Sequence, residues 1–366
     1  MKFCFFQKFN WYSVFILIIM ALFCSCSRNN NPPNIPLEKV TPVLITQPAM
    51  YDSDDPVIWI DRNDLSKSLI IGTDKDSVGA LYVYDLNGKI IEEKVVRGLK
   101  RPNNVDVEYG LLLNNTPVDI AVTTERLENR LRIYSVPEMK AIDNGGIPVF
   151  EGEAQRAPMG ISMYKRPTDG AIYAVVGRKD GPTNGTYLWQ YRLEDDGTGN
   201  VKATKVREFG MYSGVKEIEA IAVDDKLGYI YYSDEQVGVR KYLADPDAPE
   251  ANKELALFAT TGFAGDLEGI SIYEVDDRTG YILVSDQQAN EFHIFTREGE
   301  AGNPHQHNLV KIIIVSTNES DGSEVTNLPL NDKFPQGLFV AMSDNKTFQY
   351  YSWVDIAGKD LKSANK

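Results

Sequence analysis

Short acidic patches recur along the chain, each close to the start of an apolar run, and three basic residues follow later runs. The patches contain Asp52 to Asp55, Asp106, Glu217 with Glu219, Asp266 with Glu268, and Asp321. The basic residues are Lys75, Arg126 and Lys179. Carboxylates bind hard cations, and Lys and Arg bind phosphate oxygens. A fold that gathered both sets would suit a polyanion bridged by metal ions.

The overall charge also points to bound cations. The formal net charge is −14, and residues 1–26 contain two lysines and no acid, so the rest of the chain carries −16. Such an acidic protein lacks the positive field that nucleic-acid binding needs, so we expect no nucleic-acid partner. It would also repel a phosphorylated ligand unless metal ions reversed the charge locally.

The residue types favour calcium over zinc, because calcium prefers several oxygen ligands and zinc prefers His or Cys. The histidines, His293, His305 and His307, are expected to lie away from the acidic patches. This argues against a phosphohistidine intermediate, and the lack of Cys after residue 26 argues against phosphocysteine. A single acid before a strand is usually a turn or cap residue, and Asp224-Asp225 and Asp276-Asp277 are predicted to be turn residues on the opposite face.

The elements that must position these residues form a repeat. The runs 219–223 and 228–234 have the same pattern as the runs 268–272 and 280–286. Related units begin at Asp55, Asn103 and Met159, the last is expected to begin at Gln336, and each adds a third short strand. Six units at roughly 50-residue spacing predict an all-β, six-bladed β-propeller over residues 41–366.

Propeller geometry predicts where the charged residues lie. The first strand of a blade leaves one face of the disc and the second strand returns to it, so these two ends share a face near the axis. This rule places five opening residues on one face, namely Asp55, Asp106, Met159, Glu219 and Glu268. The same face is predicted to hold the residues at the ends of the second strands, namely Lys75, Arg126, Lys179, Asp234-Glu235 and Gln287. Closure of the ring is expected to pair residues 40–44 or 348–353 with the opposite terminus, which hides edge strands.

The N-terminal segment is predicted to lie outside the fold. Lys2 and Lys8 precede the apolar run 11–23, which is typical of an export signal and shorter than the roughly 20 residues of a membrane-spanning helix. Residues 1–26 are similar to a lipoprotein signal with Cys26 as the lipidated residue; an ordinary secretory signal is the alternative. Residues 27–40 are predicted to be a flexible tether, so we expect an exported protein anchored by lipid to the outer membrane or cell surface.

Taken in order, these motifs resemble the β-propeller phytase family over almost all of the chain beyond the signal. Asp52-Ser53-Asp54-Asp55-Pro56-Val57-Ile58-Trp59 is similar to the first family signature, and Asn103-Asn104-Val105-Asp106-Val107 to the second. Further similar segments follow in family order, namely 73–75, 125–126, 160–164, 178–181, those around Glu219, Glu235, Asp266 and Asp321, and 334–340.

The resemblance implies a 3-phytase that hydrolyses phosphate from phytate (myo-inositol hexakisphosphate), with several Ca²⁺ ions and with adjacent cleavage and affinity phosphate sites. It implies a calcium-bridged water as nucleophile, Glu219, Lys75 and Asp55 as catalytic residues, and no covalent phosphoenzyme. Lys75, Arg126 and Lys179 would bind phosphate. The implied metal ligands are Asp54, Asp55, Asp106, Glu219, Glu235, Asp266, Glu268, Asp321 and Asn327. We expect inositol phosphates as the ligands and a monomeric protein.

Three residues depart from the family pattern. Met159 stands where a phosphate-binding tyrosine is usual, Asn327 where an aspartate calcium ligand is usual, and Glu108 where an arginine is usual. These departures affect the expected affinity and rate more than the reaction class.

Two other functions remain open from the sequence. One is a non-catalytic, calcium-dependent surface binder of phosphorylated ligands; the other is a propeller lactonase or esterase, whose single central metal would not require three cations.

Overall fold

The computed structural model describes Met1 and residues 35–364. Apart from Met1, the predicted signal 1–26, the lipidation residue Cys26 and residues 27–34 of the predicted tether lie outside the described residues. Among the residues that are described, no helix is both long enough and apolar enough to cross a membrane.

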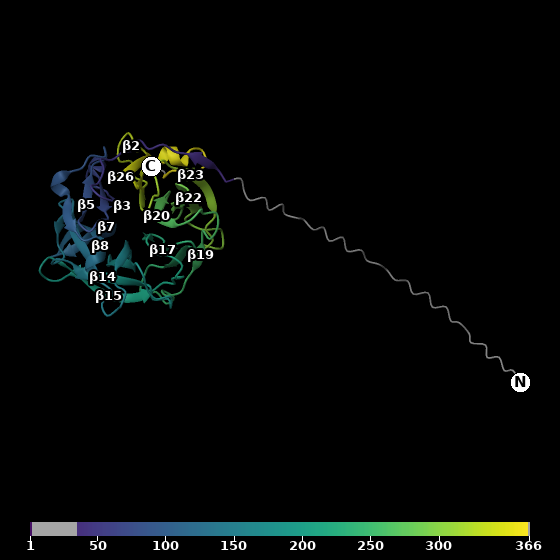
Figure 1. Cartoon of the computed structure of the whole chain (residues 1–366), viewed down its shortest axis with the longest axis horizontal. Helices are drawn as coiled ribbons and strands as arrows, with labels where there is room; N and C mark the ends of the chain where they lie inside the picture. The colour runs from purple at the N-terminus through teal and green to yellow at the C-terminus, as the bar shows by residue number, and fades with distance from the viewer. Residues whose placement is uncertain (2–34, 365–366) are drawn as a thin grey trace. The chain divides into compact units, whose positions relative to one another are not determined.

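The strands form six separate sheets arranged around a common axis, with β3, β7 and β20 near the centre and β15, β19 and β23 near the rim (Figure 1). The predicted six-bladed β-propeller is therefore confirmed. Blade 1 contains β3 (Ser53–Trp59), β4 (Leu69–Asp74), β5 (Gly79–Tyr84) and β6 (Val96–Leu99). Blade 2 contains β7 (Pro102–Leu113), β8 (Thr116–Glu125), β9 (Arg130–Val136), β10 (Lys140–Ala141) and β11 (Ile147–Pro148). Blade 3 contains β12 (Pro158–Lys165), β13 (Ile172–Arg178), β14 (Leu188–Asp195) and β15 (Val201–Phe209).

The remaining blades follow the same antiparallel plan. Blade 4 contains β16 (Ile221–Asp224), β17 (Tyr229–Asp234), β18 (Gly238–Leu243) and β19 (Ala256–Phe258). Blade 5 contains β20 (Leu267–Glu274), β21 (Gly280–Asp286), β22 (Glu291–Thr296), β23 (Leu309–Ile314) and β1 (Leu37–Lys39). Blade 6 contains β24 (Ser323–Thr326), β25 (Leu338–Ser343), β26 (Thr347–Ser352) and β2 (Leu44–Ile45). The described helices are short: η1 (Leu65–Lys67), η2 (Glu92–Lys94), η3 (Arg126–Glu128) and α1 (Trp353–Ala357).

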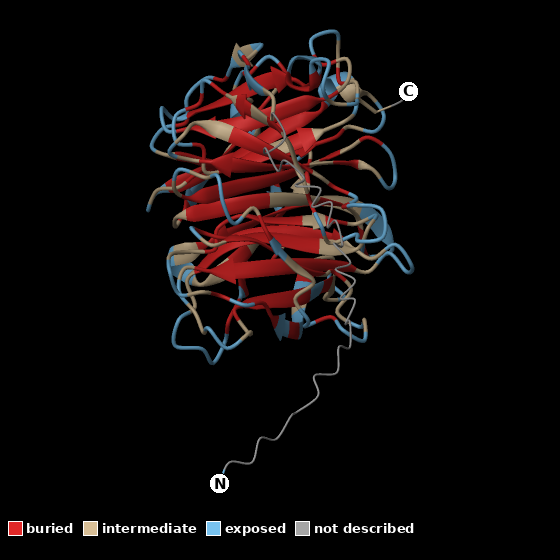
Figure 2. Ribbon diagram, turned by 90° about the vertical axis from the view of Figure 1, so that its right-hand side faces the viewer, coloured by how far each residue is buried: buried red, intermediate tan, exposed pale blue. Residues whose placement is uncertain are grey.

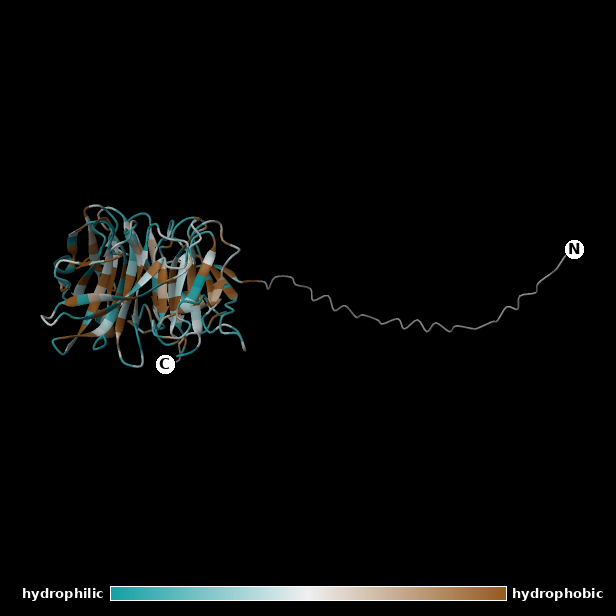
Figure 3. Ribbon diagram, turned by 90° about the horizontal axis from the view of Figure 1, so that it is seen from below, coloured by the Kyte–Doolittle hydropathy of each residue, from teal (hydrophilic) through white to brown (hydrophobic). Residues whose placement is uncertain are grey.

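Apolar side chains hold neighbouring blades together. Each of the six blade-to-blade interfaces contains one cluster of buried aliphatic and aromatic residues. The second strands β4 and β13 are buried along their whole length, because a neighbouring blade covers each side of the sheet. Figures 2 and 3 show the result, with buried and largely hydrophobic strands in the blades and polar, exposed loops at their ends. The core is therefore a ring of interfaces, and the loops at the two faces remain free for function.

The chain termini close the ring. β2 pairs antiparallel with β26, with Leu44 opposite Tyr350, so the first part of the domain completes blade 6 as its outer strand. This confirms the predicted closure. β1 pairs in parallel with β23 of blade 5, which corrects the predicted tether: Leu37–Lys39 already belong to the propeller. The tether prediction erred there because three exposed residues in a parallel edge pair carry no periodic apolar pattern.

The last repeat begins earlier than expected. Leu338–Ser343 was predicted to open the sixth unit, but it forms β25, the second strand of blade 6, and pairs with both β24 and β26. The first strand of this blade is β24, which starts just after Asp321. The runs after Gly337 and Gly160 look alike because apolar residues follow a glycine in both. Only the pairing of the strands shows that one run is a second strand and the other is a first strand.

Candidate active site

The backbone defines one functional face of the disc. In every blade the residue after the second strand donates its backbone N–H to a carbonyl just before the first strand; Lys75 pairs with Asp52, Arg126 with Arg101, and Lys179 with Ala157. The other three pairs are Glu235 with Glu217, Gln287 with Asp266, and Asp344 with Asn318. The starts of the first strands and the ends of the second strands therefore lie on the same face, as the sequence predicts. We call it the opening face.

Four acids on this face organise the loops instead of facing solvent. Asp74, Glu125, Asp234 and Asp286 end the second strands of blades 1, 2, 4 and 5. Their carboxylates accept backbone N–H bonds from the loops that precede the first strands, such as Asp52 N to Asp74 Oδ1 at 2.6 Å and Ala264 N to Asp286 Oδ2 at 2.8 Å. Sequence reasoning missed this role, although acids recur at this repeat position.

The residues that open the first strands differ from those expected in two blades. The strand register aligns Asp54, Asn103, Met159, Glu219, Glu268 and Asp321 at equivalent positions. The expectation that Asp55 and Asp106 hold these positions is therefore wrong, by one residue in blade 1 and by three in blade 2. Four first strands contain a bulge at their start, where the register shifts between Ser53/Pro56, Pro102/Val105, Pro158/Ile161 and Leu267/Ile270. A bulge changes the direction in which the neighbouring side chains project, so sequence spacing alone does not predict that direction.

Lys75 lies among the carboxylates of three blades. Its Nζ contacts Asp54 Oδ1 and lies 3.3 Å from Asp321 Oδ2 and 3.9 Å from Glu219 Oε1. Asn103 Nδ2 lies 3.3 Å from Asp54 Oδ2 and also donates to Glu219 Oε1. The structure thus brings Asp54, Glu219 and Asp321 together around one ammonium group.

A second acidic region spans blades 4 and 5. Ligand atoms of Glu217, Glu219 and Glu235 lie within 4.8 Å of one another, as do those of Glu235, Asp266 and Glu268. Lys216 Nζ lies 3.0 Å from Glu235 Oε2 and also contacts Asp266. Lys216 was not singled out from the sequence, since it belongs to the loop before the opening residue and not to the repeat position that carries the other cations.

The two other predicted phosphate-binding residues flank these acids. Lys179 Nζ pairs with Glu217, and its side chain is 38% exposed, so it can exchange this partner for a ligand. Arg126 is half-buried, and its Nε makes no hydrogen bond within the described part of the chain. Burial lowers the pKa of Arg126, while Glu219, Asp54 and Glu217 oppose this effect. Together, Asp54, Glu217, Glu219, Glu235, Asp266, Glu268 and Asp321 form what we call the acidic cluster. Both cations therefore lie beside the acidic cluster, on blades 2 and 3.

Burial makes the carboxylates of this face hard to ionise together. Burial raises the pKa of Glu268 well above its usual range, and Glu219, Glu235 and Asp321 raise it further. Burial likewise raises the pKa of Glu235 to about 8, with Lys216 opposing, and that of Asp54, with Lys75 opposing. Burial alone would lower the pKa of Lys75, but Asp54, Glu219 and Asp321 raise it overall, so this lysine stays charged. Additional positive charge at this face would lower the pKa values of these acids and stabilise their ionised forms.

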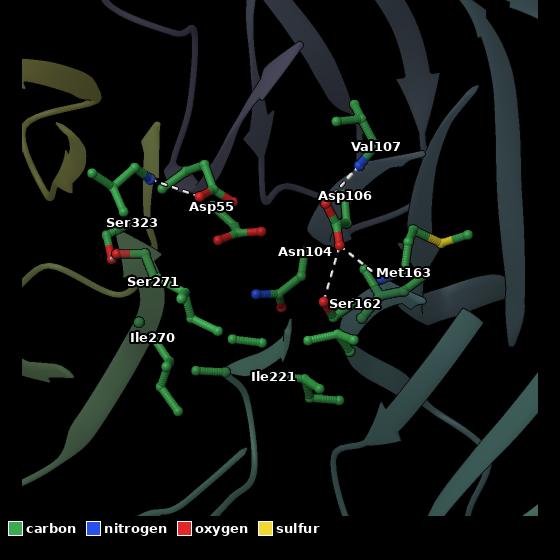
Figure 4. A pocket seen from close by; sticks show the side chains of 18 of the residues that line it. Asp55, Asn104, Asp106, Val107, Ser162, Met163, Ile221, Ile270, Ser271 and Ser323 are labelled. Carbon is green, nitrogen blue, oxygen red and sulfur yellow. Dashed lines mark hydrogen bonds between the residues drawn. The ribbon is translucent and has the colours of Figure 1, made fainter. Parts of the chain in front are cut away.

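Asp55 and Asp106 point into the central channel, a cavity of about 290 Å³ along the propeller axis (Figure 4). Asp55 Oδ2 accepts the Val105 N–H at 3.0 Å, and Asp106 Oδ2 accepts the Met163 N–H at 2.7 Å. A Cβ on Gly322 would lie 2.4 Å from Asp55 Oδ1, so the glycine makes room for this carboxylate. Burial raises the pKa of Asp55, and Asp106 and Glu219 both raise it further, so Asp55 lies in the channel between Asp106 and the acids of the opening face.

The channel below these residues is acidic. Burial raises the pKa of Asp106 to about 6, that of Glu108 to about 7, and those of Asp225 and Glu324 to about 8. Asn327 follows the far end of β24, donates to the Glu274 carbonyl at 2.7 Å and lies at the opposite end of that strand from Asp321. Asn327 lines the channel together with Asp55 and Asp106, but the structure does not bring it to the expected ligands of the opening face, and only the pairing of β24 could reveal this.

The predicted positions of the turn acids and of the histidines are confirmed in part. Asp276 accepts two backbone N–H bonds in its turn and Asp224 accepts one from Leu227 at 2.9 Å, as predicted. Asp224 also forms a buried bidentate pair with Arg297 at 2.6 and 2.7 Å, which was not expected. His307 packs on Phe258 and lies 3.2 Å from Lys241 Nζ, so it is an interior histidine. The expectation that every histidine lies away from the opening face is wrong for His293, because β22 starts at that face.

The carboxylates of the opening face fit a hard divalent cation. Oε1 of Glu235 and Oε2 of Glu268 are buried without a hydrogen-bond partner among the described residues, whereas Oε2 of Glu235 pairs with Lys216. Buried carboxylate oxygens nearly always have partners, and oxygen-only groups suit calcium. Asp54, Glu219, Glu235, Asp266, Glu268 and Asp321 are the residues that would hold such ions.

Comparison with known proteins agrees with this arrangement. The family model described as "Phytase" matches residues 27–356. A curated relative, the 3-phytase of Bacillus subtilis (strain 168), is 31% identical over 340 residues, which cover 87% of this chain and 85% of the relative. The match spans all six blades, and it includes the carboxylates of the opening face as well as Lys75, Arg126 and Lys179. The chain belongs to the phytase family.

Proposed function

We propose that this protein is a calcium-dependent 3-phytase that hydrolyses phosphate monoesters of phytate at the opening face. The observation that carries the proposal is the convergence of Lys75, Arg126 and Lys179 with the buried carboxylates of blades 1, 4, 5 and 6. The family membership and the 3-phytase relative support the reaction class.

The substrate would bind across two neighbouring regions. Lys75 would hold the oxygens of the phosphate to be cleaved, because it lies between Asp54, Glu219 and Asp321. Arg126 and Lys179 would hold a second phosphate beside it. A substrate with several phosphates on one ring can occupy both regions, which favours an inositol polyphosphate over a simple monoester.

The acids would bind cations and orient water. Calcium bound there would offset the charge on the phosphoryl oxygens and lower the pKa of the attacking water. Glu219 would fix the position of the cleaved group, since its carboxylate touches both Lys75 and Asn103. Asp55 would contribute from the channel side, where its carboxylate is fixed by the Val105 N–H. The oxygen of the water would form a new bond to phosphorus and its proton would pass to solvent, while the bond from phosphorus to the inositol oxygen breaks and the leaving oxygen takes up a proton from solvent.

Phosphate release distinguishes the candidate functions. Purified protein in excess Ca²⁺ is given phytate, a simple phosphate monoester or a lactone. We expect phosphate release from phytate, much less from the monoester, and no lactone hydrolysis. Phytate binding without release would favour the non-catalytic surface binder, and turnover of the lactone alone would favour a lactonase.

Arg126→Ala should weaken substrate binding more than turnover. Loss of one charge-assisted contact to phosphate is expected to raise KM for phytate about tenfold, with kcat changed less than threefold. Arg97→Ala is the matched control, because Arg97 is exposed, pairs with exposed Glu92 and lies over the ring of Tyr82, away from the acids of the opening face. Steady-state kinetics of both variants provide the measurement. A fall in kcat with unchanged KM would assign Arg126 to the transition state instead of to affinity.

Met159→Tyr should gain a phosphate contact at a cost in stability. A tyrosine hydroxyl bonded to phosphate is worth roughly 1.5–3 kcal/mol when well made, so kcat/KM for phytate is expected to rise by about tenfold or less. Met159 is 2% exposed, so the larger ring must also displace neighbours and lower the melting temperature. An equal gain with a small monoester would show that the new hydroxyl does not reach a second phosphate.

A further inference from the structure

Three side chains of blade 5 form a separate group on the outer side of the opening face. Asp286 ends β21 and lies directly opposite Glu291, the first residue of β22. His293 lies two residues further along β22 and so projects from the same side of the sheet as Glu291. Its Nε2 lies 3.7 Å from Asp286 Oδ2 and 3.6 Å from Glu291 Oε2, and the potential ligand atoms all lie within 4.8 Å of one another.

His293 lacks the partners that a buried histidine normally has. Its side chain is 1% exposed, yet neither ring nitrogen makes a hydrogen bond within residues 35–364. Asp286 is equally buried, and its Oδ1 has no partner there either. Buried polar groups are nearly always satisfied, so two such groups side by side indicate a missing ligand between them.

The spacing suits a small divalent metal ion. The separations of 3.6 and 3.7 Å exceed those of hydrogen bonds but are close to the roughly 3.4 Å between neighbouring ligands of a tetrahedral ion with bonds near 2.1 Å. Burial lowers the pKa of His293, which favours the neutral imidazole that metals require. The ring therefore has a free lone pair beside two carboxylates.

The charges of the group also favour a bound cation. Acids that lie directly opposite each other on neighbouring strands repel each other unless a cation lies beside them. Burial raises the pKa of Glu291, and Asp286 raises it further. Within the described part of the chain, no Lys or Arg forms an ion pair with Asp286 or Glu291. A divalent ion with two carboxylates and a neutral histidine would make the group electrically neutral.

The loop between β19 and β20 covers the group. The ring of Phe263 stacks on the imidazole with centroids 4.2 Å apart, and the Ala264 N–H binds Asp286. Phe263 and Ala264 also line a cavity of about 370 Å³ together with residues of blade 4, including Gln236 and Val237. This loop holds the imidazole in place.

We infer that Asp286, Glu291 and His293 form a binding site for a divalent transition metal ion, of which Zn²⁺ is the best match. One nitrogen and two carboxylate ligands suit Zn²⁺, whereas calcium takes oxygen ligands. Three protein ligands leave a fourth position for water or another small ligand. The site joins the β21–β22 hairpin to the covering loop, and it is independent of the acidic cluster proposed to hold calcium.

Direct metal binding tests the site without substrate, which would itself chelate zinc. The protein is first saturated with Ca²⁺ to fill the sites at the acidic cluster, and then titrated with Zn²⁺ by calorimetry and with Co²⁺ by visible absorption. We expect one Zn²⁺ per chain, with a Kd of about 1 µM or lower, and Co²⁺ bands typical of four- or five-coordinate geometry. Absence of binding, or bands typical of an octahedral aquo ion, would overturn the proposal.

Matched variants assign the ligands. His293→Gln should weaken Zn²⁺ binding at least tenfold, whereas His305→Gln, which alters a histidine on a loop packed against Tyr229, should leave it unchanged. Glu291→Gln provides a second test, because Glu291 is partly exposed and its replacement should not unfold the protein. Circular dichroism checks the fold of each variant. Equal Zn²⁺ affinity in the wild type, His293→Gln and Glu291→Gln would overturn the assignment.

Discussion

Glu219→Gln should lower kcat for calcium-phytate by about 100-fold or more while the propeller stays folded. The substitution removes one negative charge from the centre of the acidic cluster, where Glu219 lies 3.9 Å from Lys75 and within ligand distance of Glu217 and Glu235. Loss of one electrostatic contact at a reacting group typically costs two to three orders of magnitude in rate. Phosphate release at saturating substrate and calcium provides the measurement.

The fold should survive this change, because the glutamine Oε1 can still accept the hydrogen bond from Asn103 Nδ2. Glu93→Gln is a suitable control: it makes the same chemical change at an exposed residue of η2, on the outside of blade 1. The control should retain wild-type rates and melting temperature. Full turnover in Glu219→Gln would remove Glu219 from the catalytic machinery and would favour the non-catalytic binder.

Removal of calcium should abolish phosphate release and also lower the melting temperature. Without cations, the carboxylates of blades 4 and 5 repel one another within two buried groups. A ligand that binds only the folded state stabilises it by about 2.7 kcal/mol at a hundredfold excess over Kd. For a domain of this size, that corresponds to a shift of roughly 4 °C for each site filled. Differential scanning calorimetry with and without a chelator measures the shift.

Ca²⁺ added back should restore both stability and activity, and Mg²⁺ should restore much less, because Mg²⁺ requires a near-octahedral site. The chelator would also strip zinc, so the experiment is repeated with His293→Gln, which should show the same calcium-dependent shift. If melting is unchanged after complete chelation, calcium has no structural role at the acidic cluster. Phosphate release that persists in chelator would contradict a calcium-dependent mechanism altogether.

Several properties of this protein follow from the sequence alone. The repeated strand pattern determines six blades, because short β-branched and aromatic runs divided by Gly, Asp and Asn turns can bury both sides only between neighbouring blades. Strand direction then determines which ends share a face, and Lys75, Arg126 and Lys179 lie on the predicted face. The order of the motifs indicates the phytase family, and the comparisons confirm both this family and the hydrolase class.

Other properties depend on the tertiary structure. Bulges at the starts of β3, β7, β12 and β20 decide that Asp54 joins the acidic cluster while Asp55 faces the channel, since a shift of one residue turns a side chain to the other side of a strand. Asn327 is near Asp321 in sequence but is separated from it by the whole of β24. The pairing of β21 with β22 and the fold of the covering loop bring His293 to Asp286 and Glu291. Sequence spacing specifies which residues belong to each repeat, but the register of the strands and the contacts between loops decide which side chains meet.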